Sequence, residues 1–274
     1  MTTLSARAGV AIRNPQLEGL EPAQRAALGD FLLAMADSEL VIGHRHSEWT
    51  GFAPSAEEDI AFSSIAQDEM GHAHLYYALV TGVSDEEAVD SLALDRPASA
   101  LRHLPLLHAP NGDWFFTIAR QLYWETWEDV LLSAALSSPL PLLPGAAQRL
   151  LNEEVYHEEH AMEWLGLMSS REPQRTRLQA ALGRVTNLGG NPARRIGGLE
   201  ALGQSGALPA VADLAAGFSA SLRRRAQKAG WTDGAGHEAL AGLEGDQPRP
   251  NPPGLRQLHA DLTGMRRAHP GASW

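Results

Sequence analysis

The strongest chemical signal in the sequence is a pair of Glu-x-x-His motifs, each within a long segment that predicts a helix. The motifs are Glu69-Met-Gly-His72 and Glu154-Val-Tyr-His157. On a helix, side chains three residues apart share one face, so each carboxylate and its imidazole can bind the same metal ion. A single motif of this kind is common by chance on helical surfaces, and its repetition is what points to a metal site.

Two further glutamates stand at matching distances before these motifs. Glu39 precedes Glu69 by 30 residues, and Glu125 precedes Glu154 by 29 residues. The midpoint of each pair falls in a segment that breaks the helical pattern. The two breaks are residues 49–55 and 138–144. In two antiparallel helices, residues equidistant from the connecting loop lie at one level, so we expect the members of each pair to face one another.

Two such hairpins, packed about a pseudo-two-fold axis, would form a four-helix bundle with four carboxylates and two imidazoles in its core. This is the ligand set of di-iron and di-manganese carboxylate proteins. Two divalent cations would balance the four carboxylates, whose burial as unpaired ions would cost several kcal/mol each. We predict two iron ions, with Mn or Zn as alternatives. The predicted ligands are Glu39, Glu69, His72, Glu125, Glu154 and His157.

Neighbouring acids leave two choices open. Glu128 lies one turn after Glu125 and competes with it as the ligand on the third long helix, with Asp129 as a further candidate. Asp68 and Glu153 precede the motif glutamates, and by symmetry each could accept the outer N–H of the imidazole on the other hairpin. The alternative interpretation is that all of these acids are solvated residues of an acid-rich segment.

Other histidines and tryptophans are expected to have supporting positions. The small residues Ala36 and Gly43 lie on the face of Glu39 and leave room beside it. Four histidines are expected off the ligand face, at the surface or around the ligands: His44, His46, His74 and His160. Three tryptophans are expected in the core or at an interface: Trp124, Trp127 and Trp164.

The helices that must position these residues can be read from caps and apolar periodicity. Helices are expected from Pro22 to about Ser47, from the capping box Ser55-x-x-Glu58 to about Val80, and from Asp113 to about Ser137. A fourth ends near Met168, and a short one follows the capping box at 84–87. Weaker helices are expected near 172–187, 207–229 and 254–268. We predict one all-α domain over 1–274, with a bundle core at about 22–170 and a helical extension at 171–274.

The composition excludes several classes of protein. There is no Cys, so the chain itself holds no disulfide, thiolate ligand or iron–sulfur cluster. The formal charge is −11, which argues against nucleic acid as the main partner. No apolar run reaches the length of a membrane span, and residues 1–20 show no signal-peptide pattern, so we expect a cytoplasmic protein.

Arginine clusters in the last part of the chain have two interpretations. They are Arg223–Arg225 and Arg266–Arg267. The simpler interpretation is basic helix faces that meet water or an acidic partner. The other is a site for the phosphates of coenzyme A, since guanidinium groups bind phosphate in a bidentate manner.

Three segments of the sequence resemble the C-subunit family of the bacterial phenylacetyl-CoA epoxidase, the multicomponent ring-1,2-epoxidase of aerobic phenylacetate degradation. They are residues 45–54, 109–121 and 270–274. The resemblance implies a ferritin-like helical fold and a homologous catalytic A subunit, whose di-iron centre uses O2 to epoxidise the CoA-activated ring. It also implies a reductase component that carries flavin and iron–sulfur groups.

The resemblance and the residues favour different roles. Members of the C-subunit family are structural and have lost most metal ligands, whereas this sequence keeps six. The first hypothesis is therefore an epoxidase subunit that pairs with the catalytic chain, as a homodimer or hetero-oligomer, and retains its own dinuclear site. The alternative is that this chain is itself a di-iron monooxygenase. A ferritin-type ferroxidase or iron-binding protein is a further alternative, and a manganese catalase a weaker one.

Overall fold

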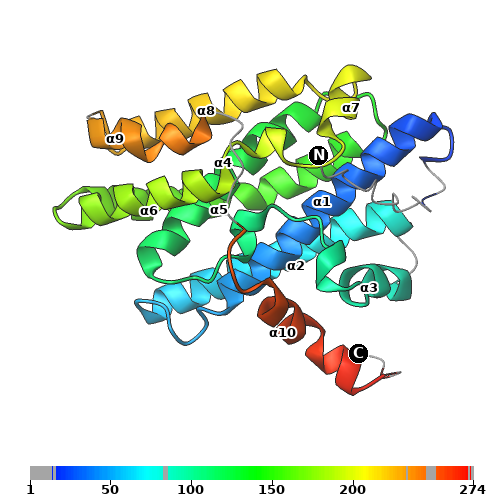
Figure 1. Ribbon diagram of the computed structural model, residues 1–274, viewed down its shortest axis with the longest axis horizontal. Helices are drawn as coiled ribbons and strands as arrows, with labels where there is room; N and C mark the ends of the chain where they lie inside the picture. The colour runs from blue at the N-terminus through cyan, green and yellow to red at the C-terminus, as the bar shows by residue number, and fades with distance from the viewer. Residues whose placement is uncertain are drawn as a thin grey trace, which may run out of the picture.

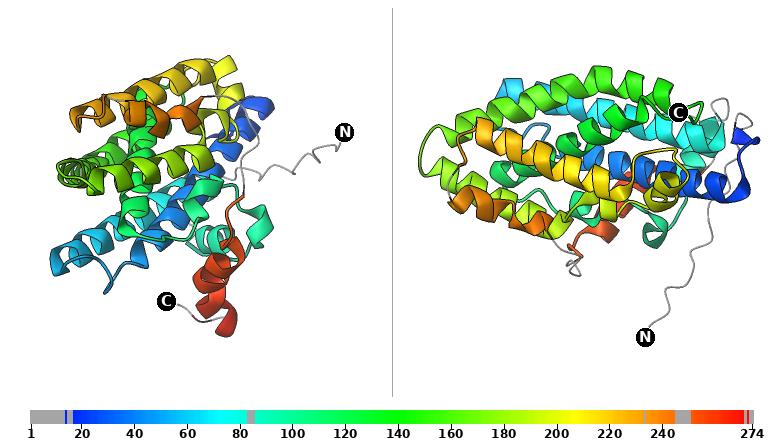
Figure 2. Two further views of the ribbon diagram at one scale, coloured as in Figure 1. Left: turned by 60° about the vertical axis from the view of Figure 1, so that its left-hand side comes forward. Right: turned by 90° about the horizontal axis from the view of Figure 1, so that it is seen from above.

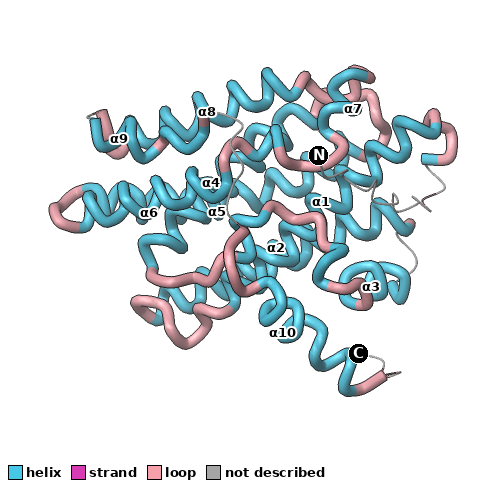
Figure 3. Tube along the Cα trace, viewed as in Figure 1, coloured by secondary structure: helices cyan, strands magenta, loops and turns pink. Residues whose placement is uncertain are grey.

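The long segments rich in Ala and Leu form helices throughout the molecule. A computed structural model of the protein describes residues 14, 17–82, 86–232, 234–244, 251–270 and 272. These residues form ten α-helices and four short 3-10 turns with no strand, which confirms the all-α prediction (Figure 3). Within the same residues, no helix has both the length and the apolar character that a bilayer crossing requires.

Four long helices make the bundle. They are α1 (Pro22–Ser47), α2 (Ala56–Thr81), α4 (Trp114–Ala135) and α5 (Leu143–Ser169). Two of the predicted caps start them: the Ser55 side chain accepts from the Glu58 N–H, and the Asp113 side chain accepts from the Phe116 N–H. Each cap satisfies a backbone donor that the first helical turn leaves unpaired.

The order of the four helices makes neighbours antiparallel. Tight reversals connect α1 to α2 and α4 to α5, whereas α2 reaches α4 by a long crossover (Figure 1). The crossover contains α3 (Glu86–Leu94), η2 (Ala98–Ala100) and η3 (Pro105–His108). The Trp49 indole donates to Thr117 Oγ1 at 3.0 Å, so the end of α1 lies at the start of α4. One long crossover of this kind is typical of the ferritin-like bundle, as predicted.

Helices after residue 170 add a second layer over α4. This layer consists of α6 (Gln174–Gly189), η4 (Pro192–Arg194), α7 (Leu199–Gln204), α8 (Val211–Lys228), α9 (Gly234–Ala239) and η5 (Ala241–Leu243). The left view in Figure 2 places α6 and α8 on one side of the bundle and α10 (Leu255–Ala268) at the opposite end. The layer leaves little of α4 exposed, and most residues of this helix are buried, polar ones included.

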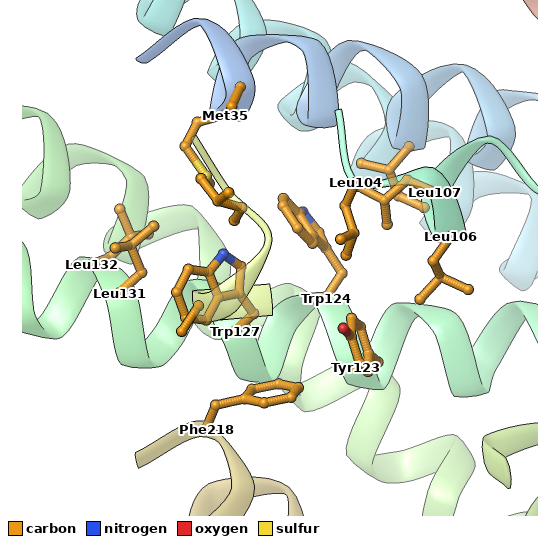
Figure 4. Close-up of a cluster of buried hydrophobic side chains, with 14 of the residues drawn as sticks. Met35, Leu104, Leu106, Leu107, Tyr123, Trp124, Trp127, Leu131, Leu132 and Phe218 are labelled. Carbon is orange, nitrogen blue, oxygen red and sulfur yellow. The ribbon is translucent and has the colours of Figure 1, made fainter. Parts of the chain in front are cut away.

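An aromatic cluster joins α4 to the added layer. Trp127 and Tyr123 on α4 pack edge-on against Phe218 of α8, with ring centroids 6.2 and 5.1 Å apart (Figure 4). Trp124 points from the same helix toward Met35 of α1 (Figure 4). Edge-to-face packing of this kind stabilises a core by about 0.5–1.5 kcal/mol per pair beyond area burial. The predicted core positions of Trp124 and Trp127 are confirmed.

A glycine allows the added layer to turn back onto α1. Gly198 has φ +80° and precedes α7, and a Cβ at this position would lie 2.1 Å from the Ala27 carbonyl oxygen. Only glycine fits, for its backbone conformation and for the space. Ser84 of the predicted capping box, and Gly271, Ser273 and Trp274 of the C-terminal motif, lie outside the described residues.

Candidate metal centre

All six predicted ligands lie inside the bundle. Glu39 comes from α1, Glu69 and His72 from α2, Glu125 from α4, and Glu154 and His157 from α5. Each is at most 4% exposed, so the alternative of a solvated acidic surface is wrong for these residues. Because Lys, Glu and Asp are almost never fully buried without a partner, this concentration of acids needs an explanation.

The ligand atoms gather into three overlapping groups. Within each group, one atom from every residue lies within 4.8 Å of the others. The groups are Glu39–Glu69–His72, Glu69–Glu125–His157 and His72–Glu128–Glu154. The first lies within one hairpin, and the other two join the hairpins. The residues that are equidistant from each connecting loop therefore lie at one level of the bundle, as expected from the sequence.

Glu128 belongs to this cluster together with Glu125. The sequence left open which of the two is the ligand on the third long helix, and both are buried next to the other acids. The cluster therefore holds five carboxylates, one more than the symmetric pattern predicts. Asp129, the further candidate, instead pairs with Arg225 at 3.1 Å.

Most of the polar atoms in the cluster lack partners. Both carboxylate oxygens of Glu39, Glu69, Glu125, Glu128 and Glu154 are buried without a hydrogen bond, as are Nδ1 of His72 and of His157. Leaving so many acceptors unsatisfied is costly in a medium of low dielectric constant. Oxygen and imidazole donors around a shared space fit two divalent cations such as iron, manganese or zinc.

Burial opposes ionisation of four of the acids, and it raises the pKa of Glu69 among them. Burial raises the pKa of Glu39 well above its usual value, and the negative charges of Glu128 and Glu69 add to the shift. Burial likewise raises the pKa of Glu125 and of Glu128, with further repulsion from Glu154. Without cations, the cluster must therefore take up protons instead.

Glu154 and His157 behave as an ion pair. Burial opposes ionisation of Glu154, but the neighbouring imidazoles of His157 and His72 outweigh it and lower the pKa of this carboxyl. Burial opposes the charged form of His157, yet Glu154 raises the pKa of the imidazole to about 9. In the metal-free protein, a protonated imidazole thus takes the place that a cation would fill.

The outer nitrogens of the two imidazoles are paired across the hairpins. His72 Nε2 lies 2.8 Å from Glu153 Oε2, and His157 Nε2 lies 3.3 Å from Asp68 Oδ2. A carboxylate can only accept, so Nε2 of each ring carries a proton, and Nδ1 is the nitrogen that faces the cluster. Both contacts were expected from symmetry. Such carboxylate–imidazole pairs orient metal-binding histidines.

Gly43 sets the distance between α1 and α2 at the cluster. A Cβ at this position would lie 2.9 Å from Glu69 Cβ and 3.2 Å from the Ala66 carbonyl oxygen. The predicted room beside Glu39 therefore exists, and Glu69 occupies it. The close approach of the two helices brings Glu39 and Glu69 into one group.

His46 is a site residue that the sequence interpretation placed off the ligand face. The imidazole is fully buried, neither ring nitrogen has a hydrogen-bond partner, and Nδ1 lies 3.6 Å from Glu69 Oε1. Burial lowers the pKa of His46 well below its usual value, so the ring is neutral. Its position seven residues after Glu39, two turns along the same face, is the signal that could have identified it.

The other three histidines lie away from the ligand cluster, as expected. His74 is exposed, and His44 is partly buried near Glu48. His160 lies between Glu58 and Gln121, at 2.8 and 3.1 Å.

The arginine clusters face acids of this same chain. Arg266 pairs with Glu87, Asp90 and Asp95 of α3 and the segment after it. Arg225 pairs with acids of α4 and α5, and Arg223 pairs with Glu244. These three guanidinium groups thus have carboxylate partners within this chain, which neither interpretation anticipated.

Comparison with known proteins points to one family. The family described as phenylacetic acid catabolic protein matches residues 15–274. The C subunit of the 1,2-phenylacetyl-CoA epoxidase of Escherichia coli (strain K12) is 31% identical over 135 residues, which are 49% of this chain and 54% of that protein. The alignment with this relative thus spans about half of its length.

Proposed function

We propose, from the premise that the chain belongs to the phenylacetic acid catabolic protein family, that it is one component of a multicomponent phenylacetyl-CoA epoxidase acting in the cytoplasm. In this role it pairs with a homologous catalytic di-iron A subunit, which a reductase component supplies with electrons. The chain also keeps a dinuclear metal site of its own. The similarity to the C subunit of an epoxidase supports the first part of the proposal.

The observation that carries the metal site is the buried set of unpartnered donors. Glutamates and histidines from all four bundle helices bring their carboxylate oxygens and inner nitrogens together in three overlapping groups. Two iron ions held there would supply O2-dependent redox chemistry and Lewis acidity. The protein contributes the orientation of the donors: Glu153 and Asp68 accept from the outer nitrogens of the two imidazoles and hold the rings in place.

A second candidate function follows from the same donors. A chain that retains a full carboxylate–imidazole set could itself be the catalytic di-iron monooxygenase rather than a structural partner. The two functions differ in what they need for turnover. Phenylacetyl-CoA would be consumed by this chain and reductase alone only if the second function is correct. A ferritin-type ferroxidase would instead accumulate many irons per chain.

Metal analysis of protein produced with iron supplied tests the site. We expect about two metal ions per chain, the stoichiometry of this ligand set. Glu69→Ala removes a donor shared by two groups and should lower the content to below about one ion. Glu159→Ala, an exposed acid on α5, is the matched control and should leave the content unchanged.

Two outcomes would contradict the proposal in different ways. Wild-type protein free of metal after iron supply would refute the dinuclear site. Failure to co-purify with a co-expressed homologous catalytic subunit would refute the epoxidase pairing.

A further inference from the structure

A small cavity opens between α4 and α5 beside the metal centre. Its volume is about 140 Å³. Its lining consists of Glu125, Asp129, Leu151, Glu154, Val155 and Glu158. Four of these six residues are acids, and two of the four belong to the candidate metal centre. The cavity therefore joins the buried donors to the seam between two helices.

The four acids are graded in exposure along the cavity. The side chains of Asp129 and Glu158 are 41% and 36% exposed at its outer edge. Glu125 and Glu154 are 2% and 4% exposed at its inner end, and their carboxylate oxygens have no hydrogen-bond partner. The acids thus form a path from solvent to two buried carboxylates of the candidate metal centre.

An arginine from the added layer stands at the outer edge of this path. Arg225 of α8 lies 3.1 Å from Asp129 and 2.6 Å from Glu158, so it connects α4 and α5 across the seam. Its side chain is 7% exposed and also donates to Ser221. A cation is therefore already held between the two outer carboxylates.

We infer that the α4–α5 cavity is the route by which divalent cations reach the metal centre, and that Arg225 is its gate. The inference rests on the proposed metal site. A chain of carboxylates attracts an incoming cation and lowers its local electrostatic energy, as clefts lined by one sign of charge do. The same carboxylates repel an anionic thioester such as an acyl-CoA. An incoming cation takes over the carboxylates that Arg225 otherwise neutralises.

The rate at which metal-free protein takes up Co2+ tests this route. Absorbance of bound Co2+ reports both the rate and the final stoichiometry in a stopped-flow experiment. The double variant Asp129→Asn/Glu158→Gln removes the outer carboxylates and leaves the ligands intact. We expect uptake to slow about tenfold, with an unchanged final stoichiometry. Arg225→Gln removes the competing cation and should speed uptake about threefold.

Glu159→Gln is the matched control for charge. This exposed acid neighbours Glu158 on α5 but does not line the cavity, so its loss should change the rate by less than about twofold. The difference between the double variant and the wild type should shrink at high salt, because ions screen the outer carboxylates. If the double variant fails to fold, the single substitutions decide, and each should slow uptake about threefold.

The outcomes separate this inference from the proposed function. Equal rates for wild type and double variant at equal stoichiometry would refute the route and leave the metal site intact. Slowing of the same size in Glu159→Gln would also refute it, since net charge rather than the cavity would then control uptake. No Co2+ bound to the wild type would refute both.

Discussion

His72 on α2 and Glu153 on α5 form a contact of 2.8 Å between the two helical hairpins. The imidazole is almost fully buried, whereas the carboxylate is 41% exposed. The contact therefore connects the candidate metal centre to the surface, and it orients His72 so that Nδ1 points inward. Its counterpart, His157 with Asp68, repeats the arrangement with the helices exchanged.

Removal of the Glu153 carboxylate should weaken metal binding without unfolding the protein. Glu153→Ala frees His72 to rotate and to change tautomer, and loss of such a partner typically costs about 10–100-fold in metal affinity. Competition with a chelator measures the change. Glu159→Ala serves as the control for charge on the same helix. An affinity equal to that of the wild type would show that Glu153 has no orienting role.

Gly43→Ala should push α1 and α2 apart at the centre. The new methyl group would lie 2.9 Å from Glu69 Cβ, and overpacking of this kind costs about 1–3 kcal/mol in the free energy of unfolding. Gly71→Ala on α2 is the control, since no atom lies within 4 Å of the added Cβ. There we expect a gain of about 0.5–1 kcal/mol from helix propensity. Urea denaturation measures the free energy of unfolding of both variants. Equal changes in the two would contradict the close approach of Gly43 to Glu69.

His46→Phe should lower metal affinity while leaving the fold stable. Phenylalanine keeps the edge-on packing against Phe62, whose ring centroid is 5.0 Å from that of His46, but offers no group to Glu69. We expect about a tenfold loss of affinity. His160→Phe should show the reverse, with a stability loss of about 1–3 kcal/mol because Glu58 and Gln121 each lose one hydrogen bond. Calorimetric titration and thermal melting distinguish the two. The same pattern in both variants would contradict the role given to His46.

The metal-free protein should lose stability as the pH rises from about 7, where the histidines with lowered pKa values no longer contribute, to about 9. Glu39, Glu125 and Glu128 have raised pKa values, so the folded state binds more protons than the unfolded state, and this stabilisation is lost as they ionise. His157, with a pKa of about 9, contributes in the same direction, because its stabilisation is complete below the unfolded value and disappears above about 9.

Denaturation midpoints at several pH values, with and without bound metal, check this prediction. The metal-loaded protein should depend far less on pH in this window, since cations replace the protons. Metal-free protein with equal stability at pH 7 and 9 would contradict the raised pKa values.

The sequence was most informative where the causes of structure are local. Ser55 and Asp113 start helices through their own side chains, and these starts were predicted correctly. The heights of the candidate ligands in the bundle could also be predicted, because each residue of a helix adds a constant rise and the positions of the two loops were recognisable.

Features that depend on how helices meet were not predictable in this way. Whether Glu125, Glu128 or both face the centre depends on the rotation of α4, which the added layer over its outer face determines. The burial of His46 depends on the approach of α1 to α2, which Gly43 makes possible. The short helices α7 and α9 lie in Gly-rich segments and form against neighbouring helices, so the sequence pattern showed neither of them.

Glu69 and His72 each belong to two of the three donor groups. Two ions bound there cannot be independent, because the first to arrive orients side chains that the second also needs. Occupancy should therefore rise steeply and sigmoidally with free metal concentration, and chains carrying a single ion should be scarce at equilibrium.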